Sequence, residues 1–274
     1  MILFFKYRFI NTLALVFLLV TTLLGQDLQE VKIANEYLAR GEKEKALEAY
    51  QNLAKNQANI STIHSNYFNL LLGLGKYKQA EDYIERQIKR DTKFSYRVDL
   101  FIVYVKAGDQ AKADRYFKAL LKANTEDIYR LKSTADYLSS FNLLNYAGDA
   151  LLQTRVAGGP MLFSLELANL YRMQGRREEM VNEYLNYVTL TPGNGAYVKN
   201  LLQMLLSKPE ELETLERVLF ERVQQNQDSE IFADLLIWVN LQQKIFITPL
   251  FKPELLINVL KKMNRRHWKL GRSL

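Results

Sequence analysis

Gly75-Lys-Tyr-Lys-Gln-Ala80 decides the fold, because near-copies of this stretch recur along the chain. The other copies begin at Gly41, Gly108, Asn142 and Gly175. Each copy closes on an apolar residue, and the closing residues lie 34, 33, 34 and 33 positions apart: Ala46, Ala80, Ala113, Ala147 and Met180. A fixed period in this range predicts a stacked array of helical repeats and outweighs any single motif.

Two further apolar positions keep the same register. Four residues after each closing residue stands a bulky side chain: Tyr50, Ile84, Phe117, Leu151 and Tyr184. Nine residues before it stands another: Tyr37, Leu71, Tyr104, Leu138 and Tyr171. The glycine can end one helix in a left-handed conformation, the small residue admits a second helix, and the bulky residue fills the space between them. Each repeat is therefore predicted to be two antiparallel helices joined by a short turn.

The pattern resembles the tetratricopeptide repeat over residues 28–243. Two copies carry most of the resemblance: Ala34, Tyr37, Gly41, Ala46 and Tyr50, and Ala168, Tyr171, Gly175, Tyr184 and Pro192. The chain departs from the family pattern where Asn142 replaces the turn glycine, where Met180 replaces the alanine, and where the opening tryptophan is absent. The resemblance implies an all-α fold, a right-handed solenoid of about six and a half helical hairpins.

Residues 1–25 lie outside the array. Lys6 and Arg8 precede an uncharged run of 16 residues, Phe9 to Leu24, which ends at Gly25. This order is typical of a secretory signal peptide cleaved after Gly25. An uncleaved membrane anchor is the alternative, although the run is shorter than the roughly 20 residues that span a bilayer. The chain has no cysteine, so the exported array of residues 26–243 would depend on packing rather than on disulfides.

The positive charge of the chain is concentrated at its end. The chain has 37 basic and 30 acidic residues, a net charge of +7, and residues 244–274 contribute eight basic residues and one acid, Glu254. The preceding residues therefore sum to zero, so the net charge gives no reason to expect nucleic-acid binding by the repeats.

The tail, residues 244–274, breaks the repeat. Pro249 and Pro253 prevent a continuous helix where the second helix of repeat seven is due. One interpretation is a basic tail, with Trp268, that binds anionic lipid or nucleic acid. Another is a frameshift product, because codons for Lys244 onward can be chosen so that a shifted frame continues the repeat. In that case the natural protein would be longer.

The sequence offers little material for catalysis. With two histidines, His64 and His267, and no cysteine, it predicts no metal site, no cofactor and no catalytic residue. His64 stands where the family pattern has a core aromatic residue, so a packed histidine is expected. Gly158-Gly159-Pro160 lacks the ending of a phosphate loop and is interpreted as a turn between repeats. We therefore predict that the chain is not an enzyme.

The resemblance implies a groove lined by the first helix of each repeat. In this family the residue after the small position generally faces the groove, which here gives Asn35, Asn69, Ile102, Asp136 and Asn169. Arg172, one turn beyond Asn169, could add a charged contact. A carboxamide both donates and accepts hydrogen bonds, so these residues could bind the backbone of an extended peptide. The alternative is that they only keep the inner surface solvated.

These observations predict a scaffold or adaptor that binds a peptide or partner protein in the periplasm or cell envelope of a bacterium. The alternative is a membrane-anchored assembly factor facing the periplasm, held by residues 1–25. The partner, the pathway and the oligomeric state do not follow from the residues.

Overall fold

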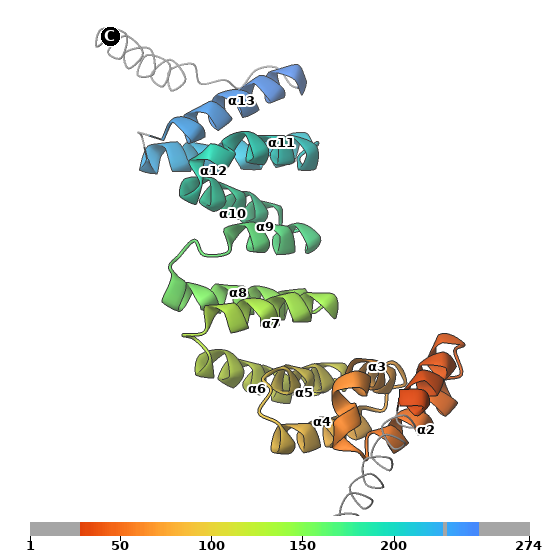
Figure 1. Ribbon diagram of the computed structural model, residues 1–274. Helices are drawn as coiled ribbons and strands as arrows, with labels where there is room; N and C mark the ends of the chain where they lie inside the picture. Colours follow the sequence, from red (N-terminus) through yellow and green to blue (C-terminus); the bar gives the residue numbers. More distant parts are fainter. Residues whose placement is uncertain (1–27, 227–228, 247–274) are drawn as a thin grey trace, which may run out of the picture. The chain divides into compact units, whose positions relative to one another are not determined.

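The computed structural model describes residues 28–226 and 229–246, and these residues form helices without any strand. The predicted all-α class is confirmed (Figure 1). None of the helices in this part of the chain has the length and apolar character that crossing a membrane requires. The segments 1–25 and 247–274, on which the leader and most of the tail predictions fall, lie outside the described residues.

The chain divides into two compact units, Met1–Leu120 and Leu121–Leu274. In the first unit, a helix at residues 28–39 pairs with α2, and two further hairpins follow. The elements are α2 (Lys43–Leu53), η1 (Gln57–Asn59), α3 (Ile60–Gly73), α4 (Tyr77–Arg90), α5 (Ser95–Lys106) and α6 (Gln110–Ala123), whose last turn passes into the second unit.

The second unit continues the same arrangement with three hairpins and one more helix. Its elements are α7 (Ile128–Ser140), α8 (Leu144–Gly158), α9 (Ser164–Met173), α10 (Arg177–Leu190), η2 (Pro192–Asn194), α11 (Gly195–Leu205), α12 (Pro209–Gln225) and α13 (Glu230–Phe246). Among the described residues the two units thus hold six hairpins and the first helix of a seventh repeat. The right-handed winding of a complete solenoid stays a prediction.

The turn inside each of the first five hairpins is set by one residue with a positive φ angle. Gly75 has φ of 66°, its N–H donates to the Leu72 carbonyl at 3.0 Å, and the next N–H, of Lys76, donates to Leu71 at 2.9 Å. These are the two hydrogen bonds of a Schellman motif, which satisfies carbonyls at the end of a helix. Asn142 adopts φ of 58° at the equivalent place. Asparagine is one of the few residues that tolerates this conformation, which explains why it can replace the glycine.

The residues that keep the repeat register form the core. The closing residues Ala46, Ala80, Ala113, Ala147 and Met180 are all fully buried, and so are the bulky residues one turn later or nearly so. In the third hairpin the Phe101 and Phe117 rings stack with centroids 4.5 Å apart, which joins α5 directly to α6. The predicted packing of a small residue and a large residue between the two helices is confirmed.

The Glu211 side chain caps the start of α12. The sequence suggests a capping box between Ser207 and Glu210, but the Glu211 carboxylate accepts the backbone N–H groups of Ser207 and Lys208, at 3.1 and 3.2 Å. Pro209 occupies the first helical turn, which moves the third helical position to Glu211. The predicted end of the array at residue 243 falls inside α13, which continues to Phe246.

We predict that Gly75→Ala lowers the free energy of unfolding by about 1–2 kcal/mol, because a Cβ is unfavourable in the left-handed conformation. Gly73→Ala, two residues earlier in α3, should instead raise it by about 0.5–1 kcal/mol, because alanine is the better helix former. Neither added Cβ meets another atom within 4 Å, so the two changes differ only in backbone conformation. Urea unfolding followed by circular dichroism measures both. Equal effects would contradict the proposed turn.

Candidate functional site

The predicted groove residues occupy equivalent places on first helices. Asn35 lies on the helix at residues 28–39, Asn69 on α3, Asp136 on α7, and Asn169 and Arg172 on α9. All five side chains are exposed. Repeat register therefore places polar side chains at the surface of successive first helices, which the prediction of a binding face requires.

Ile102 does not belong to this exposed set. Its side chain is fully buried in α5, where residues 98–104 are all buried. This continuous buried stretch takes up the part of α5 where repeat register places Ile102. In the sequence, the apolar run Leu100–Val105 indicated a buried segment. Repeat register alone predicted that Ile102 would be exposed like the asparagines.

The structure adds Asn200 and Asp234 to the exposed set. Asn200 is exposed on α11 and Asp234 on α13, each at the place that Asn169 occupies on α9. Asn200 follows Asn169 by 31 residues rather than 33 or 34, so a fixed spacing missed it. A sequence signal was present, because Asn169-Leu170-Tyr171 and Asn200-Leu201-Leu202 are alike.

Two methionines extend this surface on the second unit. Met173 and Met204 lie one turn after Asn169 and Asn200, and their exposed fractions are 59% and 69%. Tyr197, one turn before Asn200, is 50% exposed. Thioether side chains adapt to different apolar groups, which suits a surface that binds a partner. We call Asn169, Arg172, Met173, Asn200 and Met204 the α9–α11 surface.

The polar residues of the exposed set differ in the hydrogen bonds and ion pairs that they form within the protein. The Tyr50 hydroxyl donates to Asn35 Oδ1 at 2.5 Å, and Asn66 Nδ2 donates to the same oxygen at 2.9 Å. The Tyr184 hydroxyl donates to Asn169 Oδ1 at 3.2 Å. Asp136 is paired with Lys132 of its own helix at 2.8 Å.

His64 forms a packed polar cluster in the first unit. Its Nε2 lies 3.0 Å from Asp99 Oδ2 and its Nδ1 lies 3.0 Å from the Tyr83 hydroxyl. Because an ionised carboxylate only accepts, Nε2 donates to Asp99. Burial raises the pKa of Tyr83, which is fully buried. The expected packed histidine is confirmed, and its partners consume both ring nitrogens.

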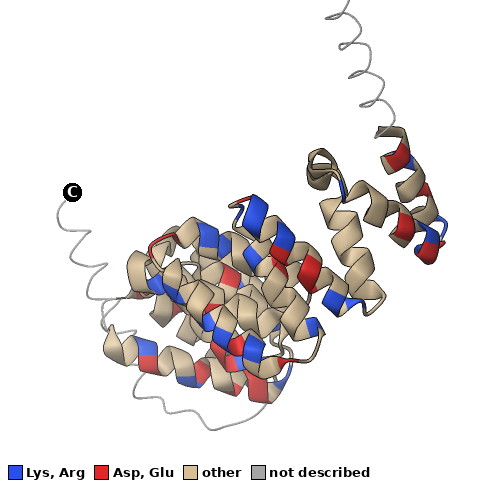
Figure 2. Ribbon diagram, turned by 90° about the horizontal axis from the view of Figure 1, so that it is seen from below, with Lys and Arg blue, Asp and Glu red and all other residues tan. Residues whose placement is uncertain are grey.

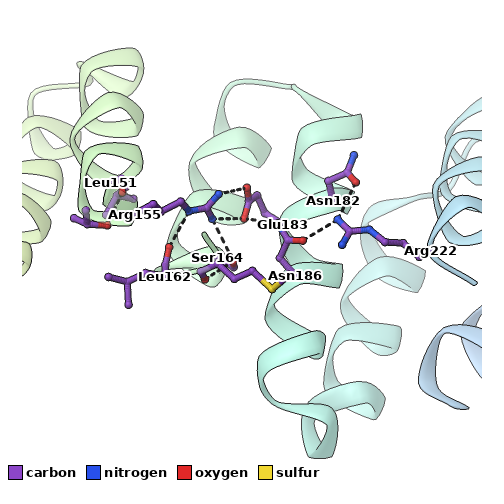
Figure 3. A network of polar contacts seen from close by, with 10 residues as sticks. Leu151, Arg155, Leu162, Ser164, Asn182, Glu183, Asn186 and Arg222 are labelled. Atoms are coloured by element: carbon purple, nitrogen blue, oxygen red, sulfur yellow. Dashed lines mark hydrogen bonds and ion pairs between the residues drawn. The ribbon is translucent and has the colours of Figure 1, made fainter. Parts of the chain in front are cut away.

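A second polar cluster joins α8, α9 and α10 in the second unit (Figure 3). Arg155 Nη1 and Nη2 donate to the two carboxylate oxygens of Glu183 at 3.0 and 2.6 Å, a bidentate pair. Arg155 also donates to Ser164 Oγ and to the Leu162 carbonyl, both at 3.2 Å. The guanidinium therefore holds the segment between α8 and α9 against α10.

The same cluster continues to α12. Asn186 Nδ2 donates to Glu183 Oε2 at 3.2 Å, and Arg222 Nη2 donates to Asn186 Oδ1 at 2.8 Å and to Asn182 Oδ1 at 3.2 Å. The side chains of Arg155 and Glu183 are only 15% and 9% exposed. Such a satisfied and largely buried network fixes the packing of consecutive repeats. Sequence reasoning missed it, because its members are brought together by packing of different repeats.

The described residues hold no group of three or more histidine, cysteine, aspartate or glutamate side chains that could bind a metal ion. Acidic and basic residues are interspersed along the helices (Figure 2). The exposed polar face of the first helices is taken as the candidate site.

Comparison with models of known protein families finds no match. Comparison with curated protein sequences finds none either.

Several solved structures are similar to this chain. A tetratricopeptide repeat protein from Parabacteroides merdae shares 14% identity, with 86% of this chain and 97% of that chain covered and a TM-score of 0.37. The C-terminal part of a TPR repeat-containing protein from Cytophaga hutchinsonii shares 14% identity, with 84% and 99% covered and a TM-score of 0.34. YrrB, described as a TPR protein with an unusual peptide-binding site, shares 18% identity, with 60% and 85% covered and a TM-score of 0.31.

Because these identities and TM-scores are low, the fold class is assigned from the helical hairpins of this chain itself. Their buried closing residues and left-handed turn residues are those that the resemblance to the tetratricopeptide repeat requires. Over the described residues the chain is an all-α helical repeat protein whose repeat pattern resembles the tetratricopeptide repeat.

We predict that Arg155→Ala lowers the free energy of unfolding by about 3 kcal/mol, because it leaves the Glu183 carboxylate unpaired in a largely buried place. The double variant Arg155→Met/Glu183→Leu should recover most of this loss. Arg217→Ala removes an ion pair with Glu178 in which both side chains are half-exposed, and should change stability little. Urea unfolding compares the three. A loss for Arg155→Ala no larger than for Arg217→Ala would show that the network is not structural.

Proposed function

We propose that this protein is an interaction scaffold that binds a segment of a partner protein or peptide on the exposed face of its first helices. The observation that carries the proposal is the row of exposed amide and carboxylate side chains at equivalent places on successive repeats. Within the second unit this row comprises Asp136, Asn169, Asn200 and Asp234. Repetition along an array suits an extended chain, whose backbone groups also repeat.

The exposed methionines support a protein partner. An amide row alone could do no more than keep the surface solvated. Met173 and Met204 instead leave large apolar groups in water beside Asn169 and Asn200, a cost that burial under a partner would remove. The α9–α11 surface therefore combines hydrogen-bonding groups for a peptide backbone with apolar groups for its side chains.

The proposed role is not catalytic. The two densest polar clusters, around His64 and around Arg155, consist of groups whose hydrogen-bonding atoms are held by neighbouring side chains. The phenol of Tyr83 is fully buried, so no substrate reaches it in this conformation. The interspersed charges of the array also favour a protein over a nucleic acid as partner (Figure 2).

Export is the second part of the proposal. The basic, then apolar order of residues 1–25 supports delivery to the periplasm or cell envelope of a bacterium, either with cleavage after Gly25 or as a membrane-anchored assembly factor.

We predict that Asn200→Ala combined with Arg172→Ala weakens peptide binding about tenfold or more, because each truncation removes about 1 kcal/mol of hydrogen bonding to the partner. The melting temperature should stay unchanged, because both side chains are exposed. The probe is a peptide selected from a random display library on the immobilised full chain, and its Kd is measured by calorimetry.

The matched control for this pair is Gln224→Ala, an exposed amide on the second helix α12. It should leave the Kd unchanged. Selected peptides that bind the double variant as tightly as the wild type would place the binding face elsewhere. Failure of the library to yield any binder would count against the scaffold itself.

For localisation, we predict that the mature protein begins at Gln26 and is released with the soluble periplasmic fraction of the expressing bacterium. N-terminal sequencing and fractionation before and after a high-salt wash measure this. Retention in the membrane with an intact Met1 would favour the anchored alternative, and a chain with Met1 in the cytoplasm would contradict export.

A further inference from the structure

Two asparagines of the exposed row share a partner that the others lack. Asn35 and Asn169 each accept a hydrogen bond from the tyrosine 15 residues later, Tyr50 and Tyr184. The tyrosine lies on the second helix of the same hairpin, one turn beyond the closing residue. Each pair therefore crosses the hairpin from the core to the exposed face.

The tyrosine hydroxyls are donors that need this partner. Tyr50 is 0% and Tyr184 is 1% exposed, and a buried phenol left without a hydrogen bond costs free energy. Burial raises the pKa of both phenols, so both hydroxyls carry a proton at neutral pH. The rest of each ring packs in the core, which fixes the point from which the hydroxyl donates.

This contact determines which half of each carboxamide faces solvent. A carboxamide has an acceptor oxygen on one side and a donor NH₂ group on the other. The oxygen of Asn169 points to the buried tyrosine, so the NH₂ group takes the exposed side. At Asn35 the oxygen accepts from both Tyr50 and Asn66, which uses both of its lone pairs.

We propose that Tyr50 and Tyr184 are positioning residues that make Asn35 and Asn169 present hydrogen-bond donors, so that each asparagine recognises an acceptor oxygen of the partner. The recognised group is a peptide carbonyl or a carboxylate. This inference deepens the proposed function and rests on it, because it names the chemistry that the binding face selects.

The other repeats provide an internal contrast. The residues 15 positions after Asn69, Asp136 and Asn200 are Ile84, Leu151 and Leu215, buried apolar side chains without a hydroxyl. The carboxamides of Asn69 and Asn200 can therefore turn to donate or to accept. Repeats one and five select an acceptor, whereas these positions adapt to either group.

The first test uses the free full chain and needs no ligand. Side-chain ¹⁵N NMR should show the Asn169 carboxamide rigid in the wild type and in Tyr171→Phe, which removes another buried tyrosine hydroxyl. In Tyr184→Phe its order parameter should fall below about 0.6, the flexible range. Nuclear Overhauser contacts between the Tyr184 ring and the Asn169 NH₂ protons should be weak in the wild type. An unchanged order parameter in Tyr184→Phe, or strong contacts that show a reversed carboxamide, would overturn the proposal.

The second test uses a library-selected peptide whose Kd rises in Asn169→Ala. Tyr184→Phe should weaken its binding about fivefold, the value of one hydrogen bond, while Tyr171→Phe should not. Replacing the contacting peptide carbonyl by a thioamide should weaken binding if a backbone carbonyl is recognised. Replacing the terminal carboxylate by a carboxamide should weaken it if a carboxylate is.

These outcomes distinguish failure of the proposed scaffold function from failure of the proposed positioning role of Tyr184. Absence of any selected peptide contradicts the proposed function, whereas the NMR measurement still decides how the carboxamide is held. A peptide that depends on Asn169 but binds Tyr184→Phe and the wild type equally supports the scaffold and overturns the positioning role. In Tyr184→Phe the preserved ring keeps the core filled, so a binding loss with an unchanged helical signal reports the hydroxyl alone.

Discussion

The close packing of two helices across a tight turn is the constraint on which the rest of this structure depends. The turn requires one residue in the left-handed conformation, Gly75 or its equivalents, and it ends the first helix with its carbonyls satisfied. The second helix can then approach because a small side chain such as Ala80 stands at the crossing. The bulky core side chains and the exposed polar residues in repeat register take their directions from this geometry.

Polar groups inside the array have two uses. Arg155 and Glu183 join consecutive repeats beside the connection between α8 and α9, and their hydrogen bonds stabilise one arrangement of those helices. Tyr184 uses its polar end differently, since its ring fills the core while its hydroxyl reaches the asparagine at the surface. Tyr184 therefore both packs in the core of its hairpin and donates a hydrogen bond to an exposed side chain of the same hairpin.

The exposed site could be predicted only as far as the repeat is regular. Register placed Asn35, Asn69, Asp136 and Asn169 correctly at the surface, because equivalent residues on equivalent helices share one direction. It failed at Ile102, where residues 98–104 of α5 are all buried, and it missed Asn200, where the repeat is shorter. In both cases local composition or spacing departs from the average repeat, and burial follows the local residues.

The sequence by itself determined the class of fold and the repeated turn, small and bulky positions of the first five hairpins, because a period of 33–34 residues with these residues in fixed order admits few packings. Only the tertiary structure decided how Arg155 meets Glu183 and which carboxamide oxygen faces a tyrosine. These features join residues 15–28 positions apart on different helices, so they depend on distances and directions that no local pattern of residues contains.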